Sequence, residues 1–344
     1  MMEKINPRLL GVALVALALL AAPLVLNDQP YLIRVTTTAA IYAIAAYGMN
    51  IILGLTGQLS LAHGAFFGVG AYIVGLLTTD HDWSFWGSFL LAILATTALG
   101  YASGLIALRT QGAYFAIFTM ALGFLIFIVV TRWESVTHAH SGVSGVKYPE
   151  NIGPIDFTQP TTMYYFVLLI LGGAAYTTHA LLRSNAGRSL VAIRTSEDLA
   201  RSIGVNVAVG KQLAFTASAG IAGLAGGLFA SLTGFIGPDS AAIDVTFEFL
   251  LFLLIGGMGT VMGPIIGSLL VAFLFEMLQD LQSYRFIVLG PIIVLLVIFA
   301  PKGIVGYLND LIPARRRRRQ RAAARSEDAP DETPAPRTTK EEVV

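Results

Sequence analysis

Long apolar runs, repeated from one end of the chain to the other, limit what it can fold into more than any other feature. Runs of about 20 mostly Leu, Ile, Val, Ala and Phe residues recur, and a helix of that length crosses a hydrocarbon core of roughly 30 Å. A membrane β-barrel instead needs strands of about ten residues with alternating polarity, a pattern that these runs lack. Because 55% of the residues are hydrophobic and only 12% are charged, most of the chain must be solvated by lipid. We therefore predict an all-α integral membrane protein.

The apolar runs predict about ten transmembrane helices. The first run follows Lys4 and Arg8 and resembles a signal peptide, but it is longer than a typical signal core, so we interpret it as a retained helix. The expected spans are residues 9–26, 33–53, 59–77, 86–108, 112–130, 163–182, 212–235, 245–257, 262–279 and 284–300.

Basic residues are distributed unequally between the segments that join these spans. If the N-terminus is cytoplasmic, only Arg34, Arg132, Lys147 and Arg285 of the 22 Lys and Arg lie outside, as the positive-inside rule requires. The sequence therefore predicts a multi-pass protein of the bacterial inner membrane with both termini cytoplasmic. Residues 1–305 would form the permease domain, with a periplasmic loop at 132–162 and a cytoplasmic loop at 183–211. Residues 306–344 form a basic tail that we expect to be disordered and beside membrane lipid, with no nucleic-acid partner.

The stretch GLTGQLSLAHGAFFGVG, residues 54–70, joins the second and third predicted spans. Gly64 and Gly68 stand at helical spacing and would allow another helix to approach closely. Gln58, Ser60 and His63 place polar atoms where such atoms need partners. Two interpretations stay open: a helix-packing seam with satisfied hydrogen bonds, or a broken or re-entrant element in which these five residues line the substrate path.

A second glycine-rich stretch, GGMGTVMGPIIG, covers residues 256–267. Pro264 has no backbone N–H and glycine disfavours helix, so an interruption is expected here too. Two such interruptions in separate halves of a chain are typical of transporters built from internal repeats, and packing alone stays open as the other interpretation.

The inner loop contains GRSLVAIRTSEDLARSIGVN, residues 187–206. Thr195 followed by Asp198 fits a capping box for a short helix that ends near Gly204. A surface helix parallel to the membrane is the simplest interpretation. A separate ATPase would need a rigid lever at this position, and Arg188, Arg194 and Glu197 are expected to be exposed for contact with it.

Taken together, these stretches resemble a known family. The 54–70 motif, the GR-x-L-x-AIR-x-x-E pattern and the GGMGT-x-x-GP segment are similar to permeases of branched-chain (hydrophobic) amino acid ABC importers, above all the longer LivM-type subunit, over about residues 31–305. The resemblance implies a second, LivH-type permease, two ATP-binding subunits and a periplasmic substrate-binding protein. It also implies that residues 187–206 couple to an ATPase, with the candidate residues Gly187, Arg188, Arg194, Glu197 and Gly204. One departure is HSGVSGV at 140–146, which puts the loop contacts with the binding protein in doubt.

No Walker A motif is present, so ATP would be hydrolysed by a partner chain, and we expect a non-catalytic subunit without cofactor or metal. Related urea and short-amide permeases share the motifs and remain alternatives for the substrate. An ion-coupled secondary transporter would need buried ionisable groups, for which His63 and Glu276 are available, with Asp244 and Glu248 near the outer edge. A membrane enzyme is disfavoured, because the chain has no Cys and the pair His138 and His140 has no third ligand.

Overall fold

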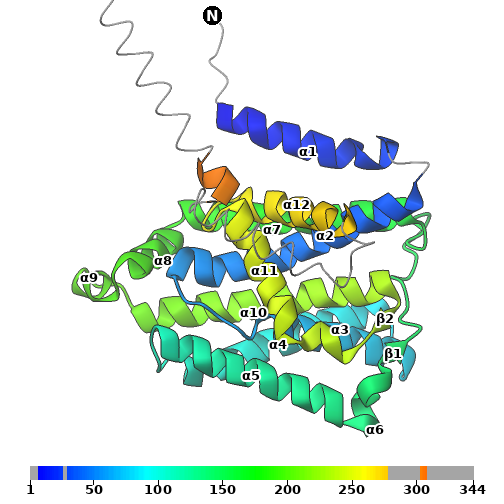
Figure 1. Cartoon of the computed structure of the whole chain (residues 1–344), viewed down its shortest axis with the longest axis horizontal. Coiled ribbons are helices and arrows are strands. Elements are labelled where there is room, and N and C mark those ends of the chain that lie inside the picture. The colour runs from blue at the N-terminus through cyan, green and yellow to red at the C-terminus, as the bar shows by residue number, and fades with distance from the viewer. Residues whose placement is uncertain (1–6, 26–28, 278–302, 308–344) are drawn as a thin grey trace, which may run out of the picture. The chain divides into compact units, whose positions relative to one another are not determined.

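The structure is a computed structural model that describes residues 7–25, 29–277 and 303–307 (Figure 1). Its long helices are α1 (Pro7–Val25), α2 (Pro30–Met49), α3 (His63–Thr79), α4 (Phe85–Ala107), α5 (Ala113–Arg132), α7 (Pro160–Arg183), α10 (Val207–Thr233), α11 (Ile243–Gly256) and α12 (Gly263–Met277). α2 continues directly into the π-helix η1 (Asn50–Leu55). Shorter elements are α6 (Glu134–Thr137), η2 (Ala139–Ser141), β1 (Val143–Ser144), α8 (Asn185–Thr195), α9 (Glu197–Ser202), β2 (Phe235–Ile236) and η3 (Pro238–Ala241).

Each apolar run predicted up to residue 279 overlaps one of these long helices, while the last predicted run, 284–300, and residues 308–344 of the basic tail lie outside the described residues. Five helices of the described part are long and apolar enough to cross a membrane: Pro30–Leu55, Phe85–Ala107, Ala113–Arg132, Pro160–Arg183 and Val207–Thr233. The chain is thus a multi-pass helical membrane protein, and the number ten stays a prediction.

Helix α10 is the centre of the packing, in contact with α2, α3 and α4. Small residues make this possible: a Cβ on Gly226 would lie 2.8 Å from the carbonyl carbon of Phe67, and Gly70 packs directly on Gly223. Backbones that approach this closely gain van der Waals contact along the crossing, which lipid tails cannot replace. Helix α2 is likewise largely buried, whereas α4, α5 and α7 bury few of their residues inside the chain.

The two ends of the helices carry different structures (Figure 1). At one end α8 and α9 form the connector between α7 and α10. At the other end β1 and β2 pair antiparallel, with Val143 opposite Ile236 and Ser144 opposite Phe235. The all-α prediction therefore misses one small sheet, which ties the loop after α5 to the end of α10.

Candidate functional site

The helix break predicted within residues 54–70 begins at Gly57, whose φ of +74° favours glycine and ends the π-helix turn. Helix α3 starts only at His63. The His63 ring contacts the backbone oxygen of Ala45 through Nε2 at 2.9 Å and the Ser218 hydroxyl through Nδ1 at 3.2 Å. Both partners lie well inside their helices, α2 and α10.

The position of His63 shows how the chain runs between η1 and α3. Ala45 precedes the end of η1 at Leu55 by about ten helical residues, or roughly 15 Å at about 1.5 Å per residue. Residues 57–62 can span roughly 20 Å when extended, so they carry the chain back into the bundle before α3 begins. We call residues 57–62 the re-entrant segment.

Threonine hydroxyls satisfy polar backbone groups of this segment and of the start of α3. Leu61 N donates to Thr119 Oγ1 of α5 at 3.0 Å. Thr246 of α11 donates to Leu61 O at 3.3 Å and accepts from Gly64 N at 2.8 Å. Non-helical backbone at membrane depth requires such protein partners, because lipid offers none.

The five path candidates are brought together at this break, and all of them are buried. His63 is held between α2 and α10, and Gly64 and Gly68 are covered by Thr246 and by Ala241 of η3. The Gln58 Oε1 and Ser60 Oγ atoms are buried without a hydrogen-bond partner in the described part of the chain. The geometry supports the packing interpretation for His63, Gly64 and Gly68, while a role of the five in the substrate path stays a prediction.

The second glycine-rich break lies directly beside the first. Residues 257–262 separate α11 from α12, with positive φ at Gly257 and Gly259. The Asn50 side chain accepts from Gly259 N at 2.7 Å and donates to Thr260 O at 2.9 Å. Tyr47 OH adds a hydrogen bond to Val261 O at 2.5 Å. Sequence reasoning missed Asn50, a buried amide in an apolar helix, which is the kind of residue that signals such a partner.

The connector is built from two capped helices. Ser184 caps α8 through Gly187 N at 3.0 Å, and Gly187 packs too closely on Leu181 for a side chain. The predicted cap at Thr195 is wrong. Ser196 accepts from Leu199 N at 3.3 Å and caps α9, whereas Thr195 is still helical and donates to Val191 O.

Gly204 ends α9 as predicted, with φ +85°. Gly204 N donates to Arg201 O and Val205 N donates to Ala200 O, both at 3.0 Å. These two bonds form a Schellman motif, in which the left-handed residue is usually glycine. The structure therefore gives Gly204 a conformational role.

The charged residues of the connector differ in exposure. Arg188 is exposed and bonds locally to Arg183 O and Asn185. Arg194 is exposed too, but its Nη1 donates to Gly54 O at 2.5 Å. The expectation of a freely exposed Glu197 is wrong, because its carboxylate is partly buried against the Lys211 ammonium. Lys211 at the start of α10 is only 3% exposed, and sequence reasoning missed it, since the sequence does not show its pairing.

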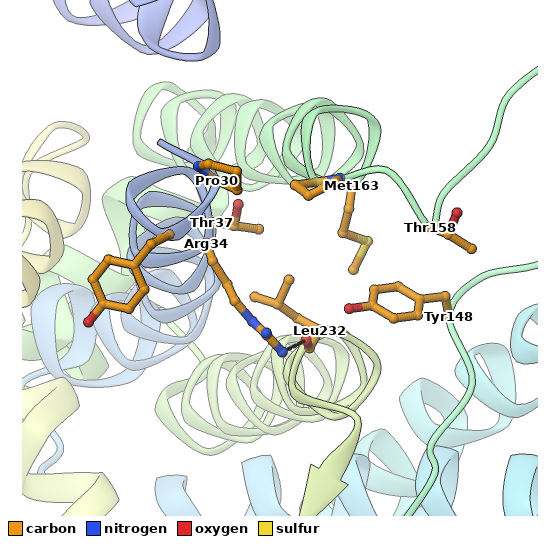
Figure 2. A pocket seen from close by; sticks show the side chains of 9 residues that line it. Pro30, Arg34, Thr37, Tyr148, Thr158, Met163 and Leu232 are labelled. Carbon is orange, nitrogen blue, oxygen red and sulfur yellow. Dashed lines mark hydrogen bonds between the residues drawn. The ribbon is translucent and has the colours of Figure 1, made fainter. Parts of the chain in front are cut away.

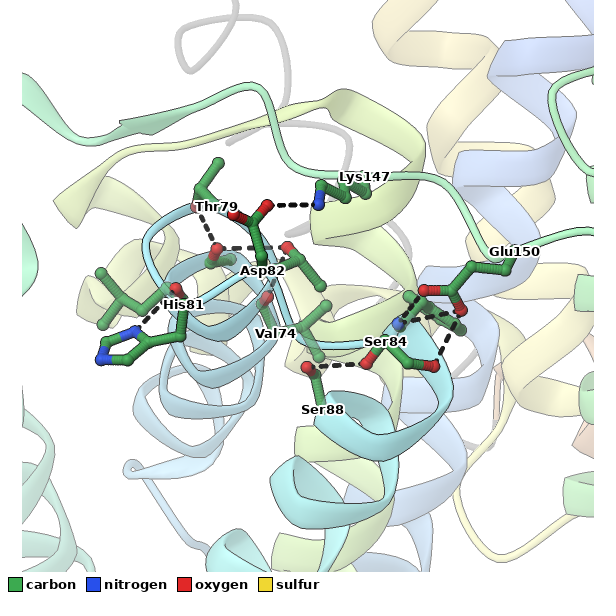
Figure 3. Close-up of polar contacts among 12 residues, drawn as sticks. Val74, Thr79, His81, Asp82, Ser84, Ser88, Lys147 and Glu150 are labelled. Atoms are coloured by element: carbon green, nitrogen blue, oxygen red, sulfur yellow. Dashed lines mark hydrogen bonds and ion pairs between the residues drawn. The ribbon is translucent and has the colours of Figure 1, made fainter.

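At the other end, polar contacts hold the predicted outer loop on the turn between α3 and α4 (Figure 3). Glu150 accepts from Phe85 N and from the Ser84 hydroxyl, both at 2.9 Å, at the N-terminus of α4. Lys147 Nζ lies 2.7 Å from Asp82 Oδ1, and this hydrogen bond lowers the pKa of the exposed Asp82. His138 contacts Asp80 at 2.8 Å, and the described residues contain no group of three His, Asp or Glu that could hold a metal.

A cavity of about 220 Å³ opens near the same end (Figure 2). Its lining residues are Pro30, Tyr31, Arg34, Thr37, Tyr148, Thr158, Pro160, Met163 and Leu232. Arg34 spans it and donates to Leu232 O at 2.9 Å, near the end of α10. None of the five path candidates lines this cavity.

Apolar helices, a re-entrant segment and an amphipathic connector define a multi-pass membrane protein of the permease type. A family model described as "Branched-chain amino acid transport system / permease component" matches residues 31–299, and the chain belongs to this family.

Individual relatives agree with the family assignment. The chain is 30% identical over 296 residues to the high-affinity branched-chain amino acid transport system permease protein LivM of Salmonella typhimurium, covering 79% of this chain and 69% of that protein. It is 30% identical to LivM of Escherichia coli K12, with 85% and 74% covered. BraD of Pseudomonas aeruginosa, a permease protein with the same description, is 25% identical, with 80% and 94% covered. No solved structure matches the chain significantly.

Proposed function

We propose that this chain is the permease subunit of an ABC importer that brings branched-chain and other hydrophobic amino acids into the cytoplasm across the bacterial inner membrane. The observation that carries the proposal is the family match over residues 31–299 together with relatives named for this transport. The chain also matches LivH of Escherichia coli K12 at 24% identity, which fits a second permease of related fold as its partner. Two ATP-binding subunits and a periplasmic binding protein complete the proposed importer.

The exposed surface of the connector supports docking of an ATP-binding subunit. Leu199 on α9 and Ile203 directly after it are 62% and 67% exposed, and Val191 on α8 is 43% exposed. Arg188 and Asp198 add charges to the same two helices. Apolar side chains left uncovered next to charges are typical of protein–protein contacts.

In the proposed topology both termini and the connector face the cytoplasm, and residues 132–162 face the periplasm. The chain has no Cys, so a single engineered thiol reports one position. We expect Ser202→Cys in α9 to be protected from a membrane-impermeant maleimide in intact cells, and Ser141→Cys in the outer loop to be labelled. Labelling of Ser202→Cys in intact cells would place the connector outside and refute the coupling role.

Transport is tested by co-expression with the partner permease and ATP-binding subunits, followed by reconstitution in vesicles. We expect leucine uptake that requires ATP and the binding protein. Leu199→Asp combined with Ile203→Asp should abolish co-purification of the ATP-binding subunits, whereas Ile152→Asp, at an apolar position of the outer loop that is 53% exposed, should not. Uptake of urea or short amides in place of leucine would correct the substrate but keep the class.

An ion-coupled transporter is the second class, and the described contacts do not favour it. Both ring nitrogens of His63 are in contact with a backbone oxygen or a hydroxyl, and Glu276 accepts from Tyr31 OH at 2.5 Å. Leucine uptake driven by an ion gradient in vesicles that contain this chain alone would favour that class over ours.

A further inference from the structure

Lys211 is a buried cation at the start of the central helix α10. It is 3% exposed, and its ammonium contacts Glu197 Oε1, the first residue of α9. A buried ion pair contributes little net stability, because desolvation offsets most of the attraction, but separating its partners leaves a buried charge uncompensated. The pair therefore opposes movement of the start of α9 away from the start of α10.

The same carboxylate oxygen also holds the re-entrant segment. Gln58 Nε2 donates to Glu197 Oε1 at 3.3 Å, and Gln58 is itself buried. Glu197 thus joins three parts of the chain: the connector, the central helix and the segment that enters the bundle. A movement of α9 displaces the acceptor that Gln58 and Lys211 share.

Arg194 makes a second connection from the connector to the first break. Its guanidinium donates to Gly54 O, a carbonyl in the last turn of η1, where a cation is favourable. Its stem packs on Gly57, where a Cβ would lie 3.1 Å from Arg194 Cγ. A Cβ on Gly259 would lie 3.1 Å from Arg194 Nη1, so the second break lies against the same side chain.

Asn50 then extends the connection to the second break. Its amide bonds to Gly259 N and Thr260 O, in the segment between α11 and α12. The chain of contacts runs from α9 through Glu197 and Gln58, and from α8 through Arg194, into η1 and on to residues 257–262. The links between elements are the Glu197–Lys211 ion pair and hydrogen bonds of Gln58, Arg194 and Asn50, and the backbone of residues 50–58 joins them.

We infer that Glu197, Lys211, Gln58 and Arg194 form a mechanical linkage, by which movement of the cytoplasmic connector repositions both helix breaks at once. This inference rests on the proposed function, since it names the residues through which the connector would act. The four residues are positioning residues, which act on the bundle without contacting the transported molecule.

The linkage is tested first on the purified chain in lipid nanodiscs, by hydrogen exchange in peptides that cover residues 57–62. We expect Glu197→Gln to raise exchange in this segment at least tenfold, because Lys211 loses its counter-charge and Gln58 its charged acceptor. Asp198→Asn is the matched control: the next residue of α9 has a side chain that is 95% exposed, and we expect no change. Equal exchange in the two variants overturns the inference.

A double variant guards against misfolding of the single one. Lys211→Met with Glu197→Leu leaves no uncompensated buried charge, so it should fold, yet it still removes the acceptor of Gln58. We expect the same rise in exchange for residues 57–62. Exchange at the wild-type rate in this double variant also overturns the inference.

The second measurement separates a linkage from a purely structural contact. In the reconstituted importer we expect the double variant to keep ATP hydrolysis within about twofold of wild type while leucine uptake falls at least tenfold, so that more ATP is consumed per molecule moved. A normal ratio of uptake to hydrolysis overturns the linkage even if exchange rises. If wild type itself shows no ATP-dependent uptake, the proposed function fails, whereas the exchange result stands on its own.

Discussion

Replacement of Gly226 by alanine should be among the most destabilising single-methyl changes in this chain. The new Cβ would lie 2.8 Å from the carbonyl carbon of Phe67 and 3.0 Å from Ala71 N, with the Phe67 oxygen nearer still. These are backbone atoms of α3, so no rotamer change relieves the overlap, and ordinary contact requires the helices to separate by more than half an ångström. The neighbouring contact of Gly70 with Gly223 would open at the same time. We expect a loss of about 3 kcal/mol in the free energy of unfolding, at the upper end for overpacked cores.

Gly172→Ala is the matched control for this change. Gly172 lies inside α7 with no atom within 4 Å of the place that a methyl group would take, so alanine should stabilise the helix by about 0.5 kcal/mol. Unfolding in mixed micelles with increasing dodecyl sulfate, followed by the fluorescence of the three Trp residues, gives both free energies. If Gly226→Ala and Gly172→Ala unfold at the same detergent fraction, the close packing of α10 on α3 is refuted.

Three further predictions test the site and its surroundings. Ser196→Ala should destabilise α9 by about 1 kcal/mol, which would appear as faster amide exchange in residues 197–202. Thr195→Ala should leave this exchange unchanged. Faster exchange in Thr195→Ala than in Ser196→Ala would instead support the capping box at Thr195. Thr246→Val should lower the free energy of unfolding by about 1–3 kcal/mol, because it leaves Gly64 N unpaired. Thr177→Val, at an exposed threonine of α7, should change the free energy little in the same detergent unfolding. Equal losses in the two variants would contradict the role of Thr246 in holding the segment. Contact with Lys147 lowers the pKa of Asp82, so the outer loop should resist limited proteolysis at neutral pH and lose this protection only as the pH falls below the ordinary aspartate pKa of about 3.9. Lys147→Ala should remove the protection at neutral pH as well. A loop that is equally resistant in this variant would show that the pair does not hold it.

The positions of the long helices were predictable because a membrane demands about 20 apolar residues from each crossing, whatever the helix packs against. The break after Gly57 was predictable too, since glycines and polar residues interrupt an apolar run there. Its depth was not. The path of residues 57–62 depends on hydroxyls of Thr119 and Thr246, which come from helices far along the chain.

The internal contacts of the connector escaped prediction for a similar reason. Glu197 and Lys211 stand 14 residues apart, a spacing that carries no helical or strand signal, and Gln58 joins them from 139 residues away. The cap was missed because Thr195 and Ser196 are adjacent hydroxyl residues, and only the backbone geometry distinguishes them. The pairing of Val143 with Ile236 likewise follows from tertiary structure and from no local pattern.

The hydroxyl of Thr246 has a consequence for how the chain is assembled in the membrane. Gly64 is synthesised 182 residues before Thr246, whose hydroxyl accepts its hydrogen bond. Leu61 is synthesised 58 residues before its own acceptor, Thr119. Until α11 is inserted, Gly64 N lacks its partner, and until α10 is inserted the burial of α2 and α3 is incomplete as well. Helices α2 and α3 therefore reach their final packing only after the second half of the chain has been inserted, and the polar backbone between them needs other partners until then.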